Sequence, residues 1–231
     1  MRRAALALAW LFIAGWASAA AARPTVVAEL FTSQGCSSCV AADKLLDQIA
    51  DRPGVLALTF AVDYWDYLGW SDTFARPEFS ARQRAYMQHM AQREVYTPQI
   101  IIDGVGQTAG ADGDKVQAMI RQAQRDRIHA PPLRWLRRGK VAIGPGRAPQ
   151  GGAEVWLVRY DPSARQVTVK RGENRGKTLV QRNVVRQLVK LGVWRGKARV
   201  YAAPTPGPDA LKTCILLQAA GGGRILGVLQ K

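Results

Sequence analysis

Apolar and polar positions in the first half of the chain follow two alternating spacings. Residues 25–31 and 55–62 are short runs of β-branched and apolar side chains, as in buried strands. Between Cys39 and Ile49 the apolar residues recur at helical spacing. This alternation predicts the order β-α-β-α-β-β-α. The predicted elements cover residues 25–31, 39–49, 55–62, 77–94, 99–102, 105–108 and 114–128.

The spacing changes in the second half. Short apolar runs separated by Pro-rich and Gly-rich turns predict antiparallel strands rather than helices. The predicted strands cover residues 153–160, 166–170, 178–191, 198–203, 211–218 and 225–229. The segment Ala130-Pro131-Pro132 marks the change, so we expect one domain over residues 23–130 and a β-rich domain over residues 131–231.

Residues 1–22 have the three parts of a secretory signal. Met1-Arg2-Arg3 is basic, an apolar run follows, and small residues end it at Ala22. The alternative is an uncleaved membrane anchor, since about 19 apolar residues can span a bilayer. No second such run exists, so we expect a periplasmic or secreted protein with no stable membrane insertion after signal cleavage.

The formal charge of +16 is confined to one half. Residues 23–125 hold 10 basic and 12 acidic residues, whereas residues 126–231 hold 21 basic and 5 acidic ones. Export and the lack of a nucleic-acid motif argue against nucleic acid as a partner. The basic strands are either a solvated face or a surface for an anionic envelope polymer.

The candidate chemistry is the pair Cys36 and Cys39, which lies between a predicted strand and a predicted helix. A helix start stabilises a thiolate and lowers its pKa. Cys36 would be the nucleophile and Cys39 the resolving thiol, with no cofactor beyond their disulfide. A structural disulfide is the first alternative. A metal site is disfavoured because zinc needs four ligands, and Cys214, His89 and His129 have no matching spacing.

Four stretches carry a resemblance to a known family, and they extend over nearly the whole mature chain. They are 29–39 (ELFTSQGCSSC), 62–70 (VDYWDYLGW), 96–99 (YTPQ) and 172–177 (GENRGK). With these stretches the chain resembles DUF1223, exported bacterial proteins of unknown function, within the thioredoxin-like superfamily. The resemblance implies an α/β fold, with a thioredoxin-like domain followed by a β-rich antiparallel unit. In this chain Val40 stands where the family often has proline after the second cysteine.

The resemblance also implies a substrate edge beside the cysteines. Thioredoxin-type folds place a cis proline where Pro98 enters its strand, which would set the Thr97 backbone against the disulfide to dock an extended peptide. An ordinary trans proline at a strand start is the alternative. Tyr96, Thr97, Pro98 and Trp65 are therefore the expected substrate-binding residues.

Glu29 is the third expected catalytic residue. Related proteins bury an acid near this position, and Glu29 would accept the proton of Cys39. The alternative is an exposed glutamate on an edge strand. We further expect the loop 63–72 to pack over the core, with Arg82 and Gln83 paired to its acids.

Two further positions carry expectations. Cys214 is expected to be a buried free thiol, with a third redox partner as the alternative. The Lys and Arg residues of the turn 172–177 are expected to form its exposed tip.

Two functions remain open from the sequence. The first is an exported thiol–disulfide oxidoreductase acting on protein thiols and disulfides of the envelope. The second is a non-enzymatic binding module, with a structural disulfide and a basic β surface for anionic partners.

Overall fold

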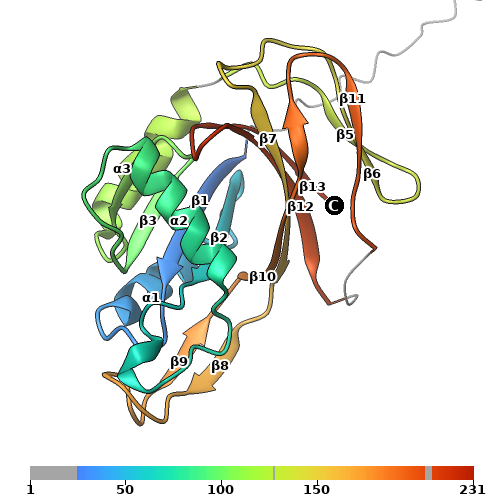
Figure 1. Ribbon diagram of the computed structural model, residues 1–231. Helices are drawn as coiled ribbons and strands as arrows, with labels where there is room; N and C mark the ends of the chain where they lie inside the picture. The colour runs from blue at the N-terminus through green and yellow to red at the C-terminus, as the bar shows by residue number, and fades with distance from the viewer. Residues whose placement is uncertain (1–24, 127, 206–209) are drawn as a thin grey trace, which may run out of the picture.

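The computed structural model describes residues 25–126, 128–205 and 210–231, and most of its strands form one large sheet (Figure 1). The predicted signal segment, residues 1–22, lies outside the described residues. The eight strands run in the order β13-β12-β7-β10-β2-β1-β3-β4. They are β1 (Val26–Thr32), β2 (Val55–Ala61), β3 (Gln99–Ile102), β4 (Gly106–Ala109), β7 (Ala153–Asp161), β10 (Val184–Trp194), β12 (Lys212–Ala219) and β13 (Ile225–Gln230).

Three helices and two smaller sheets surround the large sheet. The helices are α1 (Cys39–Ile49), α2 (Pro77–His89) and α3 (Gly113–Arg125), and a short 3₁₀ helix, η1, spans Asp66–Leu68. A three-stranded sheet contains β11 (Arg199–Ala202), β6 (Lys140–Ile143) and β5 (Leu133–Leu136). A two-stranded sheet contains β8 (Arg165–Thr168) and β9 (Thr178–Gln181). The predicted α/β class is confirmed.

The two faces of the large sheet bury different helices, because successive residues of a strand point to opposite faces. Ala28 and Leu30 of β1 pack in one cluster with α1 and α3. Val27 and Phe31 pack in another with Phe79 and Tyr86 of α2. A third cluster joins β7 and β12 to the sheet β11-β6-β5, which lies to the upper right in Figure 1.

The large sheet is continuous between the two halves of the chain. β2 pairs in parallel with β1 on one side and with β10 on the other, where Val184 is the partner of Thr59. Asn183 precedes this pair; its carbonyl accepts from the Thr59 N–H at 3.0 Å and its side chain donates to the Ala57 carbonyl at 2.8 Å. One sheet therefore spans the predicted boundary at residue 130, and the division into domains stays a prediction about folding units.

Two predicted boundaries were wrong, and two strands were missed. Residues 178–191 form two strands, β9 and β10, because Asn183 has a left-handed φ of 51°. Helix α2 ends at His89 rather than at residue 94, and Ala91 follows with a φ of 50°. Strands β5 and β6 were not predicted at all. None of the helices among the described residues is long and apolar enough to span a membrane.

Candidate functional site

The site lies where β1 ends and α1 begins. Cys36 and Cys39 form a disulfide with their Cα atoms 5.4 Å apart. The Cys36 N–H donates to the Ser33 carbonyl at 3.1 Å, and the Cys39 N–H donates to the Cys36 carbonyl at 3.3 Å. Cys39 is the first residue of α1, so the pair spans the helix start, where unpaired backbone N–H groups favour an anion.

Both cysteines are covered. Cys36 is 0% exposed and Cys39 is 1% exposed, although Ser37 and Ser38 between them are exposed. Asn174 binds the cysteine loop: its side-chain amide donates to the Cys36 carbonyl at 2.9 Å and to the Gln34 carbonyl at 3.0 Å.

The turn 172–177 therefore packs on the cysteine loop at Asn174, which is 0% exposed. The basic residues Arg175 and Lys177 of this turn are exposed, as expected. Asn174 is buried because its amide satisfies two carbonyls that would otherwise be buried without partners. Glu173 next to it is exposed and accepts a hydrogen bond from the Ser37 N–H at 2.9 Å.

Gln34 joins the cysteine loop to the loop 63–72. Its N–H donates to Asp72 at 2.7 Å, and its side-chain oxygen accepts from the Trp70 indole at 3.0 Å and from the Thr73 hydroxyl at 2.9 Å. Asp72 is 6% exposed, and burial raises its pKa to about 6. The loop packs over the core through Tyr64 and Trp65, as predicted, and Gln34 connects it to the cysteine loop.

Asp43 is a buried carboxyl on the same face of α1 as Cys39. It lies one helical turn after Cys39 and is 5% exposed. Its Oδ1 accepts from the Thr32 hydroxyl at 3.0 Å, whereas its Oδ2 has no partner among the described residues. Burial raises its pKa to about 7, and the Thr32 hydrogen bond offsets part of that rise.

The predicted substrate residues lie together at a second edge of the cysteine loop. The Trp65 indole donates to the Thr97 hydroxyl at 2.8 Å. A Cβ on Gly35 would lie 3.3 Å from the Trp65 Cβ, so Trp65 lies against the residue before Cys36. The Thr97–Pro98 peptide bond is cis, as expected. Tyr96 is half-buried, and its hydroxyl donates to Gln107 of β4.

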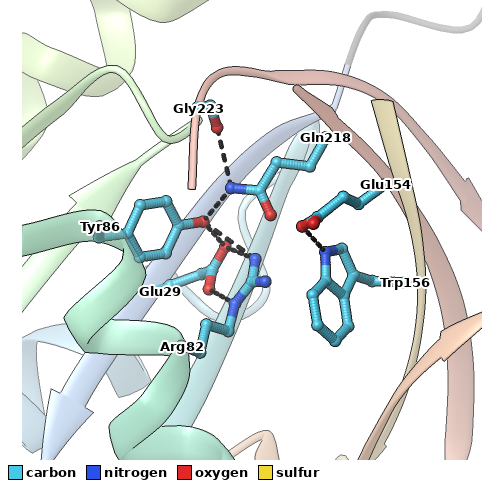
Figure 2. A network of polar contacts seen from close by, with 7 residues as sticks. All are labelled: Glu29, Arg82, Tyr86, Glu154, Trp156, Gln218 and Gly223. Atoms are coloured by element: carbon cyan, nitrogen blue, oxygen red, sulfur yellow. Dashed lines mark hydrogen bonds and ion pairs between the residues drawn. The ribbon is translucent and has the colours of Figure 1, made fainter. Parts of the chain in front are cut away.

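Glu29 lies in a buried polar network with Arg82 and Tyr86 of α2 (Figure 2). It points to the α2 face, whereas Cys39 begins α1 on the other face. Its carboxylate accepts from Arg82 at 2.6 and 2.8 Å and from the Tyr86 hydroxyl at 2.7 Å. Glu29 is 0% exposed on a strand between β2 and β3, so the exposed edge-strand alternative was wrong.

The same network corrects the expectation for Arg82 and Gln83. Arg82 pairs with Glu29 rather than with an acid of the loop 63–72, because Glu29 is the carboxylate buried beneath α2. Gln83 accepts from the Tyr64 hydroxyl at 3.1 Å. Figure 2 shows that Gln218 of β12 completes the network, donating to the Tyr86 hydroxyl and to the Gly223 carbonyl.

Cys214 is free and buried in the α2-side cluster, and burial raises the pKa of its thiol. Among the described residues, no group of three or more His, Cys, Asp or Glu side chains could hold a metal ion.

Sequence reasoning missed Asp43, Gln34, Glu173 and Asn174. Asp43 had a usable signal, since it lies on the apolar stripe of α1 with Cys39, Ala42 and Leu46.

Comparisons with known proteins give a family and a fold. The DUF1223 family, described as "Protein of unknown function (DUF1223)", matches residues 27–218. The X-ray crystal structure of protein AGR_C_4864 from Agrobacterium tumefaciens is similar at 29% identity and a TM-score of 0.67, covering 89% of this chain and 92% of that one. HBP35 of Porphyromonas gingivalis is similar in fold at 10% identity and a TM-score of 0.56, covering 90% and 75%. No curated protein matches the chain.

Proposed function

This chain belongs to the DUF1223 family, whose description assigns no function, and from the site we propose that it is an exported thiol–disulfide oxidoreductase acting on protein thiols and disulfides. The observation that carries the proposal is the Cys36–Cys39 disulfide across the start of α1. Export rests on residues 1–22, with their basic start and apolar run. The redox-active disulfide is the only cofactor that the proposal requires.

A thioredoxin-like scaffold is part of the proposal. Its support is the strand order β2-β1-β3-β4, with β1 parallel to β2 and antiparallel to β3, and β3 antiparallel to β4. Helix α1 follows β1 directly, which positions the cysteines at the end of a central strand.

The proposed exchange proceeds through Cys36. A partner thiolate attacks the Cys36 Sγ, a bond forms between the two sulfurs, and the Cys36–Cys39 bond breaks with its electron pair on Cys39. Attack by Cys39 on the mixed disulfide reverses the step. Alternatively, a second thiolate of the partner attacks the partner's own sulfur in the mixed disulfide. The bond to Cys36 then breaks, Cys36 leaves as a thiolate, and the partner leaves as a disulfide. The N-terminal end of α1 stabilises a thiolate at Cys36.

The partner would dock along Thr97. Trp65 and Thr97 form the edge next to Gly35, and an extended peptide would pair with the Thr97 backbone there. Tyr96 and Pro98 flank this edge in the chain.

Trapping in the envelope tests the proposal. A Cys39→Ser variant cannot resolve mixed disulfides, so we expect it to accumulate covalent adducts through Cys36 that dithiothreitol releases. Cys214→Ser is the matched control, because it removes a cysteine but leaves the pair intact. The purified protein should also be reduced by glutathione and should turn over insulin disulfides. A pair that resists glutathione, with no adducts and no turnover, would overturn the enzyme proposal.

One observation favours a second function, binding of an anionic envelope polymer. The segment 128–153 contains no acidic residue, and Arg134, Arg138 and Lys140 are exposed on or beside the sheet β11-β6-β5. Charge reversal by Arg134→Glu and Lys140→Glu should reduce retention on an anionic polymer such as dextran sulfate, and high salt should remove the difference. Equal retention of variant and wild type at low salt would exclude this surface.

A further inference from the structure

The turn 172–177, which we call the hairpin tip, is bound to the cysteine loop by side chains. Glu173 accepts from the Ser37 N–H at 2.9 Å, and Asn174 donates to the carbonyls of Cys36 and Gln34 at 2.9 and 3.0 Å. These contacts join residues more than 130 positions apart in the chain.

The hairpin tip is a self-contained turn. The Gly176 N–H donates to the Val169 carbonyl at 2.8 Å, and the Lys177 side chain donates to the Asn174 side-chain oxygen at 3.1 Å. Strands β8 and β9, which carry it, form a two-stranded sheet of their own, seen at the bottom of Figure 1. Displacement of the turn would break no backbone pairing of the large sheet. The base of the hairpin stays anchored, because Val169 and Leu179 are buried and Gln181 accepts from the Gln34 side chain at 3.3 Å.

The covered state of Cys36 is at odds with exchange. An attacking thiolate must approach the sulfur along the line of the S–S bond, yet Cys36 is 0% exposed. A partner can react only after part of the cover has moved. Asn174 lies against the cysteine loop, because it is itself 0% exposed and donates to the Cys36 carbonyl.

The charge of Glu173 also acts on Cys36. Its carboxylate accepts from the N–H of Ser37, next to the residues that open α1. Hydrogen bonding to Ser37 lowers the pKa of Glu173, so its negative charge is present at neutral pH. A thiolate at Cys36 would draw on the same positive helix end, so the two negative charges oppose each other.

We propose that the hairpin tip is an intramolecular lid on Cys36, and that Glu173 and Asn174 are positioning residues that slow exchange and disfavour the Cys36 thiolate while the lid is closed. This inference rests on the proposed function, since it concerns access to the same disulfide. A partner that displaces Glu173 and Asn174 uncovers the sulfur and removes the opposing charge in one movement.

Reduction by dithiothreitol tests the lid. One dithiothreitol gives up two electrons and two protons, closes to its cyclic disulfide and leaves Cys36 and Cys39 as thiols. We expect Glu173→Gln and Asn174→Ala to be reduced several-fold faster than the wild type. Glu173→Gln should also lower the pKa of the reduced Cys36 thiol by about half a unit, a gain of about threefold in thiolate at a pH below the pKa. Iodoacetamide labelling across pH measures this pKa.

Arg175→Lys is the matched control, because it changes an exposed residue of the same turn and leaves the charge of the turn unaltered, so its rates should equal those of the wild type. Glu173 is exposed, so Glu173→Gln should fold even if Asn174→Ala does not. Unchanged or slower reduction of Glu173→Gln, with an unchanged Cys36 pKa, would overturn the lid. Faster reduction of Glu173→Gln and Asn174→Ala would support the lid. If neither these variants nor the wild type turned over insulin, the result would at the same time count against the oxidoreductase.

Discussion

The guanidinium group of Arg82 binds both oxygens of the Glu29 carboxylate, at 2.6 and 2.8 Å, where each side chain is at most 4% exposed. Removal of one partner leaves an uncompensated buried charge. We therefore expect Glu29→Gln to lower the free energy of unfolding by about 3–5 kcal/mol in urea titrations. The pH profile of disulfide release should stay unchanged, because Glu29 faces α2 rather than Cys39.

The matched control replaces both charges. Glu29→Leu with Arg82→Met removes the pair together, and such replacements are often neutral in stability. The double variant should therefore be more stable than Glu29→Gln. A shifted pH profile with full stability in Glu29→Gln would show instead that Glu29 serves Cys39.

Asp43 should give stability a dependence on pH. Its pKa is raised from 3.8 to about 7 in the folded protein, so between these values the folded state holds a proton that the unfolded state has lost. The free energy of unfolding therefore falls as pH rises through this window, by up to about 1.4 kcal/mol per pH unit. Asp43→Asn should remove this slope and be the more stable protein at pH 7.

Urea titrations from pH 4 to pH 8 measure this difference. Asp72 and Asp103 also have raised pKa values and keep their own slopes in both proteins, so the difference between variant and wild type isolates Asp43. Asp47→Asn, an exposed change on the same helix, should leave the slope unaltered. If the free energies of unfolding of Asp43→Asn and the wild type changed with pH in parallel, the raised pKa of Asp43 would be contradicted.

The turn between β12 and β13 should tolerate a side chain at one glycine but not at its neighbour. A Cβ on Gly222 would lie 2.7 Å from the backbone of Ala85 in α2, whereas a Cβ on Gly221 meets nothing within 4 Å. Both glycines have positive φ, so each alanine costs about 1–2 kcal/mol of backbone strain. Only Gly222→Ala adds overpacking, about 1–3 kcal/mol more. Thermal unfolding of the two variants measures the difference in their stability. Equal Tm values would contradict the close approach of Gly222 to Ala85.

Cys214 should be unreactive in the native protein. It is 0% exposed, and burial raises the pKa of its thiol, so little thiolate is available for alkylation. Mass spectrometry after iodoacetamide should find no label on the native oxidised protein and one label, on Cys214, once urea is added. Reductant with urea should give three. Label on Cys214 without urea would contradict the buried position.

Regular spacing made the first half of the fold predictable. Helix α1 was predicted over residues 39–49 because its apolar stripe is complete within those bounds. Strands β5 and β6 were missed, since four residues with charged neighbours show too little alternation to stand out. The pairing of β10 with β2 was beyond sequence reasoning, because it depends on a left-handed residue, Asn183, meeting a strand far away in the chain.

In the candidate site, too, some features could be predicted from the sequence and others could not. Cys36, Cys39 and the cis Thr97–Pro98 bond followed from local motifs and their place between elements. Asn174 has Gly, Glu, Arg and Lys neighbours, which are typical of an exposed turn, so nothing local indicates its burial against Cys36. Contacts of that kind are fixed by the fold as a whole.

The position of β2 has a consequence for the nascent chain. All seven residues of β2 are buried, and β1 covers only one of its edges. The strand that covers the other edge begins at Val184, so translation must continue far beyond β2 before its second edge has a partner. An unpaired apolar edge recruits other strands, so the growing polypeptide is most prone to aggregation in that interval. A chain released near residue 130 would keep that edge open permanently.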